Sequence, residues 1–427
     1  SFGADDAPAT TVEAPLHELG PTFTLWIDEL HHLVWSHAID ATTALDEEAP
    51  AGVADAELAD GTPVWVDGGP LRYLAPIGGV PVVHAWAFAA GAGGPPHNTC
   101  GAALAPDQLA AVTHPGGTAR IIAPAGSGKT RVLTERARHL VSAWHVPVEA
   151  VTVVAYNKRA QEEIVARTAD LPGLRVRTLN ALALAVVNGR PPFAPQRATW
   201  RTDEQVARRV LQELVRTPAQ LNVDPYAPWL DALSATRLGL VDPVVIEAGY
   251  QTVPGFADVV PRVRRRFAEL GAFDFDEQLV RAIELLLADP QARAAAQRAC
   301  RVMLVDEFQD LTPAHLLFVR LLAGPGGAVF GVGDDDQTIY GYNGADPRWL
   351  IGFDEWFPGA GSHPLEVNYR CPPEIVDAAD HLLRHNRRRV PKTIRAARPS
   401  DGTGWVAEAS DDPVASTVGA VRRALDA

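Results

Sequence analysis

The chain has 427 residues, of which 47% are apolar and 21% charged, enough to bury the cores of about two to four domains. Three isolated cysteines, Cys100, Cys300 and Cys371, exclude a disulfide framework or a zinc module and are typical of a reducing compartment. No signal peptide is visible and no apolar run is long enough to span a bilayer, so we expect a cytoplasmic protein without a membrane partner.

The formal net charge of -14 is concentrated in residues 1–100, which hold 14 acidic side chains and one basic side chain, Arg72. The rest of the chain holds 37 basic and 38 acidic side chains, so its local basic runs can meet phosphates. The acidic segment would repel a nucleic-acid backbone. We therefore expect residues 1–100 to bind a protein partner or to be autoinhibitory, and not to bind DNA directly.

Residues 1–100 also hold four of the ten tryptophans, which indicates a small α+β module with a core of its own. Apolar residues recur at helical spacing over 24–39, whereas 62–88 is typical of short strands between Gly and Pro turns. Residues 91–101 are predicted to be a linker. The spacing of the histidines fits no standard metal site, so ordinary structural roles are favoured over metal binding for His31, His32, His37 and His84.

From about residue 104 onward, short apolar runs rich in β-branched residues alternate with helical segments. The runs are ARIIA, VTVVAY, VMLVDE and GAVFGVG. This alternation predicts buried parallel strands in a doubly wound α/β sheet. Leu, Ala and Arg at helical spacing predict a helical insertion over 185–275. The predicted domains after the acidic module are 101–184 with 276–362, the insertion 185–275, and a further unit over 363–427.

The stretch IIAPAGSGKT, residues 121–130, lies between a predicted strand and a predicted helix, which is the context of a P-loop. Backbone amides at the start of such a helix can hold phosphate oxygens. Lys129 can reach the outer phosphates, and the Thr130 hydroxyl can take a Mg²⁺ position. Ala123 occupies the first position, where the full pattern has Gly; Ala is acceptable there if that residue needs no positive φ.

The stretch VMLVDEFQD, residues 302–310, is an apolar strand that ends in two carboxylates. In P-loop NTPases these positions hold Mg²⁺ and orient the attacking water, which are the roles we expect for Asp306 and Glu307. Alone, this pattern is an ordinary acidic strand end. Together with the P-loop, it predicts a site for Mg²⁺ and ATP.

With these motifs in this order, residues 104 to about 400 resemble the superfamily 1 helicases of the UvrD/Rep/PcrA type. The resemblance implies a P-loop RecA-like parallel sheet with a helical insertion, followed over 363–427 by the beginning of a second RecA-like domain. The stretch LAPDQLAAV resembles the glutamine motif, so Gln108 is expected to recognise the adenine edge. The stretch FDFDEQLVRAI resembles the end of the inserted subdomain, or else an acidic start of an amphipathic helix.

The stretch LEVNYRCPPEIVDAA, residues 365–379, resembles motif IV, in which Tyr369 would stack on the adenine and Arg370 would be an arginine finger. A strand followed by a proline-capped helix describes the same residues. The implied catalytic residues are Lys129, Thr130, Asp306, Glu307, Gln337 and Arg370, with Thr130 and Asp306 at the metal. The implied nucleotide contacts are Gln108, Ala125, Gly126, Ser127, Gly128, Lys129, Thr130, Arg131 and Tyr369.

The stretch GAVFGVGDDDQTIYGYNG, residues 327–344, resembles motif III, which couples ATP to DNA. Gln337 would sense the γ-phosphate, and Tyr342 would stack on a base, because an aromatic face accepts any base. Tyr342 and Asn343 stand where the family has Trp-Arg, so a cation is missing there. The run Asp334–Asp336 is predicted to form a turn and not to bind a second metal.

Three further segments are candidate DNA contacts. VAYNK resembles motif Ia, with Tyr156, Asn157 and Lys158 as candidates, and VRTLNALAL contributes Thr178 and Asn180. The basic run HNRRRVPKTIRAAR, residues 385–398, would contact phosphates or else be a solvated helix end.

The resemblance implies an ATP-dependent 3′–5′ DNA helicase or translocase that acts on single-stranded DNA or a single/double-strand junction, in repair or recombination. We find no motifs V and VI in the chain. The alternative is therefore an ATP-gated DNA- or protein-binding adaptor, a half-motor that a partner chain completes. An unrelated P-loop ATPase is a third, weaker possibility.

Overall fold

The computed structural model describes residues 104–114, 118–142, 146–197, 199–217, 224–250, 252–324, 327–338, 341, 344–400 and 410–426, together with short strands before residue 100. These early strands are β1 (Thr10–Ala14), β2 (Phe23–Ile27), β3 (Leu33–Trp35), β4 (Ile39–Asp40), β5 (Leu71–Leu74) and β6 (Ala85–Ala90). The helix predicted over 24–39 is wrong, because the described backbone there forms β2, β3 and β4, which pair with other strands. The strands predicted within 62–88 are confirmed by β5 and β6. The four histidines and the linker lie outside the described residues.

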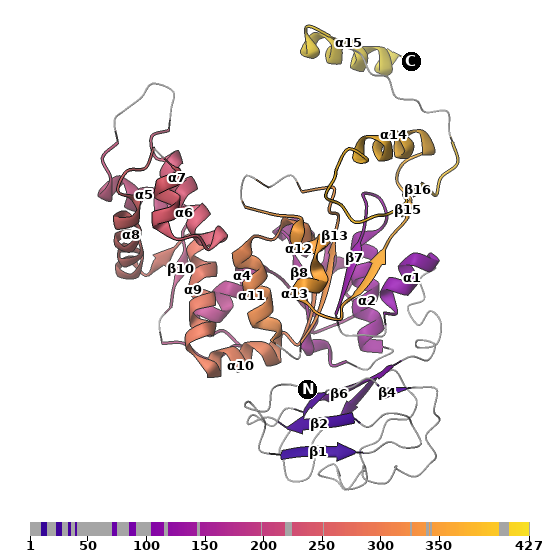
Figure 1. Cartoon of the computed structure of the whole chain (residues 1–427), viewed down its shortest axis with the longest axis horizontal. Coiled ribbons are helices and arrows are strands. Elements are labelled where there is room, and N and C mark those ends of the chain that lie inside the picture. The colour runs from indigo at the N-terminus through magenta and orange to yellow at the C-terminus, as the bar shows by residue number, and fades with distance from the viewer. Residues whose placement is uncertain are drawn as a thin grey trace.

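A six-stranded sheet forms the centre of the rest of the chain, in the order β14-β7-β13-β12-β8-β9 (Figure 1). All of its neighbouring strands pair in parallel. Its strands are β7 (Ala119–Ile122), β8 (Val151–Ala155), β9 (Arg175–Thr178), β12 (Val302–Val305), β13 (Ala328–Gly333) and β14 (Gly361–Pro364). The prediction of a parallel α/β sheet is confirmed.

The sheet separates two hydrophobic cores. Successive side chains of a strand point to opposite faces, and accordingly Val302 and Leu304 join one core while Met303 and Val305 join the other. The first core is covered by α1 (Pro106–Val112), α2 (Lys129–Ser142) and α3 (Lys158–Arg167). The second is covered by α4 (Leu179–Val187), α9 (Phe275–Ala288), α10 (Pro290–Ala299) and α11 (Pro313–Ala323). Burial on both faces explains why the strands are continuously apolar.

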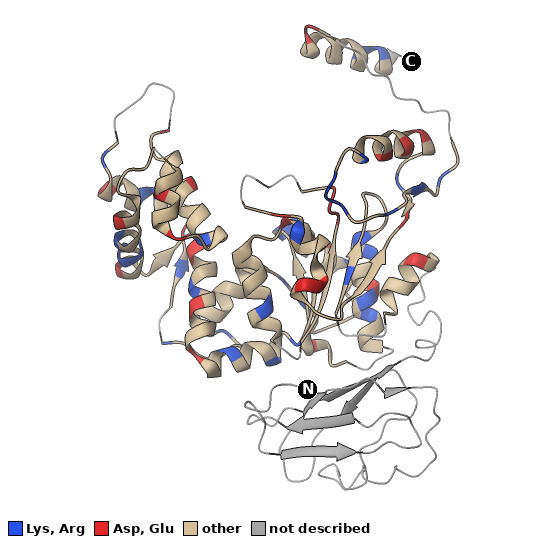
Figure 2. Cartoon of the chain, in the orientation of Figure 1, with Lys and Arg blue, Asp and Glu red and all other residues tan. Residues whose placement is uncertain are grey.

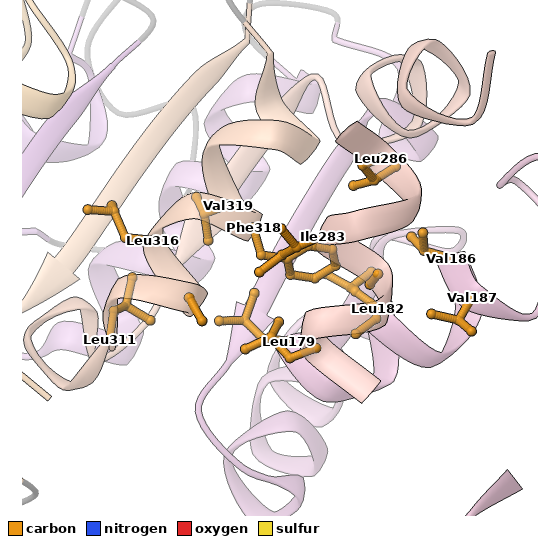
Figure 3. Packing of buried hydrophobic residues seen from close by; sticks show 14 of the residues in the cluster. Leu179, Leu182, Val186, Val187, Ile283, Leu286, Leu311, Leu316, Phe318 and Val319 are labelled. Atoms are coloured by element: carbon orange, nitrogen blue, oxygen red, sulfur yellow. The ribbon is translucent and has the colours of Figure 1, made fainter. Parts of the chain in front are cut away.

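Helices α4, α9 and α11 pack against one another in the second core (Figure 3). Helix α4 presents Leu179, Leu182 and Val186 at helical spacing, and all three are buried. Ile283 of α9 and Phe318 of α11 belong to the same cluster. The same cluster contains residues of the sheet and of the predicted helical insertion. Helices α4, α9 and α11 therefore pack in a core that the sheet and the insertion share.

The predicted insertion is helical in the structure. It contains α5 (Val206–Leu214), α6 (Ala227–Gly239), α7 (Pro243–Gly249) and α8 (Phe256–Leu270), which form a group beside the central sheet in Figure 1. Two short strands, β10 (Arg201–Thr202) and β11 (Ala272–Phe273), pair in parallel where the chain enters and leaves this group. Basic and acidic positions are interspersed along these helices in Figure 2. Its bounds as a domain stay a prediction.

The segment after β14 is less regular. It contains β15 (Val367–Asn368) paired in parallel with β16 (Arg395–Ala396), and α14 (Pro373–Leu383) between them. Before β14 lie the short helices α12 (Arg348–Ile351) and α13 (Phe353–Trp356), and near the end lies α15 (Pro413–Asp426). Within the described ranges, no helix combines the length and the apolar character needed to cross a membrane.

Candidate nucleotide site

The predicted P-loop joins the end of β7 to the start of α2. Gly126 and Gly128 have φ angles of +78° and +93°, a region that favours glycine because it has no Cβ. Among the described residues, only Leu240 and Glu307 combine a side chain with a positive φ, so Ala123 needs no glycine. Ala123 is buried, and its amide donates to the carbonyl oxygen of Gly333 at 2.7 Å. The loop therefore opens α2 with the backbone shape that suits phosphate oxygens at a helix N-terminus.

Three side chains from three motifs meet at Lys129. Its Nζ lies 2.8 Å from Oε2 of Glu307 and 3.5 Å from Oε1 of Gln337. The same Glu307 oxygen accepts a hydrogen bond from Nε2 of Gln309 at 2.9 Å. Glu307 has a φ of +49°, and non-Gly residues in this region cluster at functional sites. The fold thus brings together the lysine, the carboxylate and the amide that the sequence placed in separate motifs.

Asp306 is the second carboxylate at the end of β12, and it is only 8% exposed. Burial, followed by the negative charge of Glu307, raises the pKa of Asp306 to about 7. Its Oδ1 atom has no hydrogen-bond partner in the described part of the chain. Burial likewise raises the pKa of Asp310 to about 6. Asp306 and the Thr130 hydroxyl are the two groups expected at the metal. A buried carboxylate oxygen without a hydrogen-bond partner fits a cation that prefers oxygen ligands, such as Mg²⁺.

Gln108 lies against the P-loop. Its side chain is buried, and Nε2 donates to the carbonyl oxygen of Ser127 at 2.7 Å while Oε1 accepts from the amide of Ala105 at 3.3 Å. A Cβ atom on Gly128 would lie 2.8 Å from this Nε2. Gln108 thus supports the loop from the α1 side, and recognition of adenine by this residue stays a prediction.

Asn368 attaches the motif IV segment to the P-loop, a role that the sequence analysis missed. Its Nδ2 donates to the carbonyl oxygen of Ala125 at 2.8 Å, and its Oδ1 accepts from the amides of Arg370 and Cys371 at 2.8 and 2.9 Å. The amide of Tyr369 donates to the carbonyl oxygen of Gly126 at 2.9 Å. The backbone of Tyr369 and Arg370 therefore lies directly beside the P-loop. The signal available in the sequence was an asparagine directly before the Tyr-Arg pair of motif IV.

The candidate DNA contacts follow the carboxyl ends of β8 and β9. Tyr156 is 41% exposed, and the side chain of Lys158 is 87% exposed. Asn157 accepts from the amide of Ala160 at 2.9 Å as the N-cap of α3. These three residues place an aromatic, a cap and a cation at one strand end.

The next strand end carries Thr178, whose hydroxyl oxygen accepts from the amide of Ala181 at 3.1 Å as the N-cap of α4. The backbone carbonyl oxygen of Asn180 accepts from the side chain of Gln278. Asn157 and Thr178 thus have capping roles whether or not they contact DNA. Tyr342 and Asn343 lie outside the described residues.

The run Asp334–Asp336 forms a turn, in which the amide of Gln337 donates to the carbonyl oxygen of Asp334 at 3.0 Å. The three carboxylates also surround Lys392, whose side chain is 0% exposed. For this residue, neither interpretation of the basic run 385–398 is right, since Lys392 is neither free for DNA phosphates nor solvated. The neighbouring Arg387 and Arg388 are exposed.

Comparison with known proteins identifies the family. Residues 104–358 match the family model of the UvrD/REP helicase N-terminal domain. The chain belongs to the UvrD/REP helicase family. This segment contains the P-loop, both carboxylates and Gln337, so the family match and the site geometry concern the same residues.

Curated relatives of this UvrD/REP family chain include helicases from three bacteria. A putative ATP-dependent DNA helicase YjcD of Bacillus subtilis is 30% identical over 312 residues, which cover 68% of this chain and 40% of the relative. The ATP-dependent DNA helicase PcrA of Leuconostoc citreum is 31% identical over 300 residues, covering 67% and 40%. The ATP-dependent DNA helicase UvrD1 of Mycobacterium tuberculosis is 31% identical over 312 residues, covering 68% and 40%. The matched region thus spans about 40% of the length of these relatives.

Proposed function

We propose that the chain is the nucleotide-binding part of an ATP-dependent DNA helicase or translocase that couples hydrolysis of Mg-ATP to movement on single-stranded DNA. The observation that carries the proposal is the convergence of Glu307 and Gln337 on Lys129 at the mouth of the P-loop. Family membership supports it, as do relatives that are named ATP-dependent DNA helicases.

The residues of the site are proposed to have separate roles in phosphoryl transfer. Thr130 and Asp306 would hold Mg²⁺, which would neutralise charge on the phosphate oxygens. Lys129 is held by the Glu307 carboxylate at 2.8 Å, and a bound γ-phosphate competes for the same ammonium. Once Lys129 turns to the phosphate, the carboxylate of Glu307 is free to orient and deprotonate the attacking water.

The remaining residues position the nucleotide and report its state. Gln337 can donate a hydrogen bond from Nε2 to a γ-phosphate oxygen. The side chain of Arg370 begins beside the P-loop, since a Cβ atom added to Gly126 would lie 2.8 Å from the Cβ atom of Arg370. Arg370 can therefore stabilise transferred charge as an arginine finger. Tyr369 is 42% exposed and offers its ring to the adenine.

The DNA strand is proposed to contact the carboxyl ends of β8 and β9, where Tyr156 and Lys158 are exposed. An aromatic face beside a cation suits single-stranded DNA, because bases stack on the ring and phosphates meet the charge. The 3′–5′ direction and a role in repair or recombination are parts of the proposal that rest on the resemblance to the family. A protein partner for the acidic residues 1–100 rests on their charge.

ATP turnover measured with and without single-stranded DNA tests the proposal. We expect DNA to raise kcat, and Glu307→Gln to lower kcat by roughly 100-fold or more while leaving nucleotide affinity nearly unchanged, because general-base catalysis contributes about that factor. A kcat for ATP that is the same with and without single-stranded DNA would favour an unrelated P-loop ATPase. DNA binding that changes with nucleotide in the absence of turnover would favour the adaptor.

A further inference from the structure

Lys392 lies among three buried carboxylates on the turn after β13. Its Nζ is 2.5 Å from Oδ1 of Asp335, 2.8 Å from Oδ2 of Asp336 and 3.4 Å from Oδ1 of Asp334. The side chain of Lys392 is 0% exposed, and none of the three aspartate side chains exceeds 4%. A lysine side chain without exposed surface is unusual unless it is paired, and here it is paired with three carboxylates.

Other groups of the same segment hold the turn from the same side. Arg389 Nη2 lies 2.8 Å from Oδ2 of Asp336, and the amide of Val390 donates to Oδ2 of Asp335 at 2.6 Å. Burial alone would lower the pKa of Lys392, but the surrounding carboxylates outweigh it and the pKa is raised. Lys392 therefore stays charged. In Figure 2, its basic segment follows α14.

The Asp334 carboxylate connects this cluster to the nucleotide site. Its Oδ2 accepts from Nε2 of Gln337 at 2.7 Å, and the Oε1 of that glutamine lies 3.5 Å from Nζ of Lys129. The amide of Asp334 donates to Oε1 of Gln309 at 3.0 Å, and Gln309 donates to Glu307 at 2.9 Å. A continuous chain of contacts thus runs from Lys392 to both partners of Lys129.

We propose that Lys392 is a positioning residue for γ-phosphate recognition. It holds Asp334, whose carboxylate accepts one Nε2 hydrogen of Gln337 and so fixes this amide with its second Nε2 hydrogen left to be donated to a γ-phosphate oxygen. The inference rests on the proposed function and adds a role for a residue outside the P-loop and its carboxylates. A compact ammonium suits the position, because its three N–H donors can point from one nitrogen to three surrounding carboxylates. A displacement of the segment 386–392 would withdraw Lys392 from Asp334. The Gln337 side chain would then lose its fixed orientation.

Competition binding with Mg-ATPγS and Mg-ADP against a fluorescent nucleotide tests the inference. The wild-type chain is expected to prefer ATPγS, and Lys392→Gln to lose roughly tenfold of that preference with ADP affinity nearly unchanged, the size of one hydrogen bond to a charged group. Gln337→Ala should lose the same preference, and adding Lys392→Gln to it should cost nothing further. Arg384→Gln, which removes a cation that is 72% exposed, is the control and should behave as wild type.

A second variant covers the case in which Lys392→Gln fails to fold. Lys392→Met with Asp335→Asn removes one cation and one carboxylate together, so the net charge of the cluster is kept while Asp334 still loses its partner. It should show the same loss of preference. An unchanged preference in either folded variant, or a loss that multiplies with that of Gln337→Ala, overturns the inference alone. A wild-type chain that binds neither nucleotide overturns the proposed function and the inference with it.

Discussion

Asn368→Ala should detach the motif IV segment from the P-loop. Asn368 is 7% exposed, and its side chain makes three hydrogen bonds, one to the carbonyl oxygen of Ala125 and two from the amides of Arg370 and Cys371. Alanine leaves all three backbone groups without this partner. The expected result is a local opening at Tyr369 and Arg370, with weaker nucleotide binding as its consequence.

The size of the effect follows from the number of bonds lost. A buried hydrogen bond contributes about 1 kcal/mol net, so the free energy of local opening should fall by about 2 to 3 kcal/mol. Amide exchange at Arg370 and Cys371 should then become roughly 30- to 150-fold faster. Hydrogen exchange read by mass spectrometry on a peptide that spans both amides measures this directly.

Two variants serve as controls for Asn368→Ala. Asn368→Asp keeps the acceptor for the amides of Arg370 and Cys371 but loses the donor to Ala125, so it should preserve most of the protection. Asn188 makes similar hydrogen bonds to the backbone of Trp200, at 2.9 and 2.7 Å, and Asn188→Ala should leave exchange at Arg370 unchanged. Equal exchange rates at these amides in Asn368→Ala and Asn188→Ala would contradict the role of Asn368 in holding the motif IV segment.

Two further predictions concern DNA and pH. Lys158→Ala should weaken binding of single-stranded DNA and reduce its logarithmic salt dependence by about one, whereas Arg384→Ala should change neither; equal salt slopes for both variants would remove Lys158 from the DNA path. His139 is 1% exposed, and burial, followed by the charge of Arg136, lowers its pKa from 6.5 to about 3. Below pH 6.5, His139 therefore binds fewer protons in the folded state than in the unfolded state. Its contribution to the free energy of unfolding is fully present above that pH and is lost as the pH falls toward 3. His139→Gln should reduce the loss of unfolding free energy between pH 7 and pH 5 by about 2 kcal/mol, measured by urea denaturation, and an unchanged loss would contradict the shift.

The nucleotide motifs could be predicted because their chemistry fixes local spacing. A strand, a glycine loop and a helix occur together in sequence, and the structure places Lys129 at the start of α2 as expected. Asp306 and Glu307 follow an apolar strand that is buried on both faces, so their place at the edge of the sheet follows from the pattern. Only Ala123 departed from the motif, and its backbone needs no glycine.

Contacts between distant segments could not be predicted in the same way. A run of basic residues after α14 is typical of a solvated or DNA-facing surface, and nothing local indicates that Lys392 is buried against a turn 57 residues earlier. Asn368 is likewise defined by its contact with Ala125, 243 residues away. The helix expected over 24–39 failed because helical apolar spacing in a short stretch does not exclude strands, and pairing between strands decides the outcome.

Calorimetric titration of Mg-ATPγS into the wild-type chain and into Lys129→Ala tests whether the P-loop binds the nucleotide. We expect saturable binding at one site in the wild type, weakened roughly tenfold or more in Lys129→Ala, because a charge-assisted contact to phosphate is lost. The partner residues of Lys129 are held by other contacts as well, so the variant should keep its fold. Equal affinity of the two chains would contradict the assignment of the P-loop as the nucleotide site.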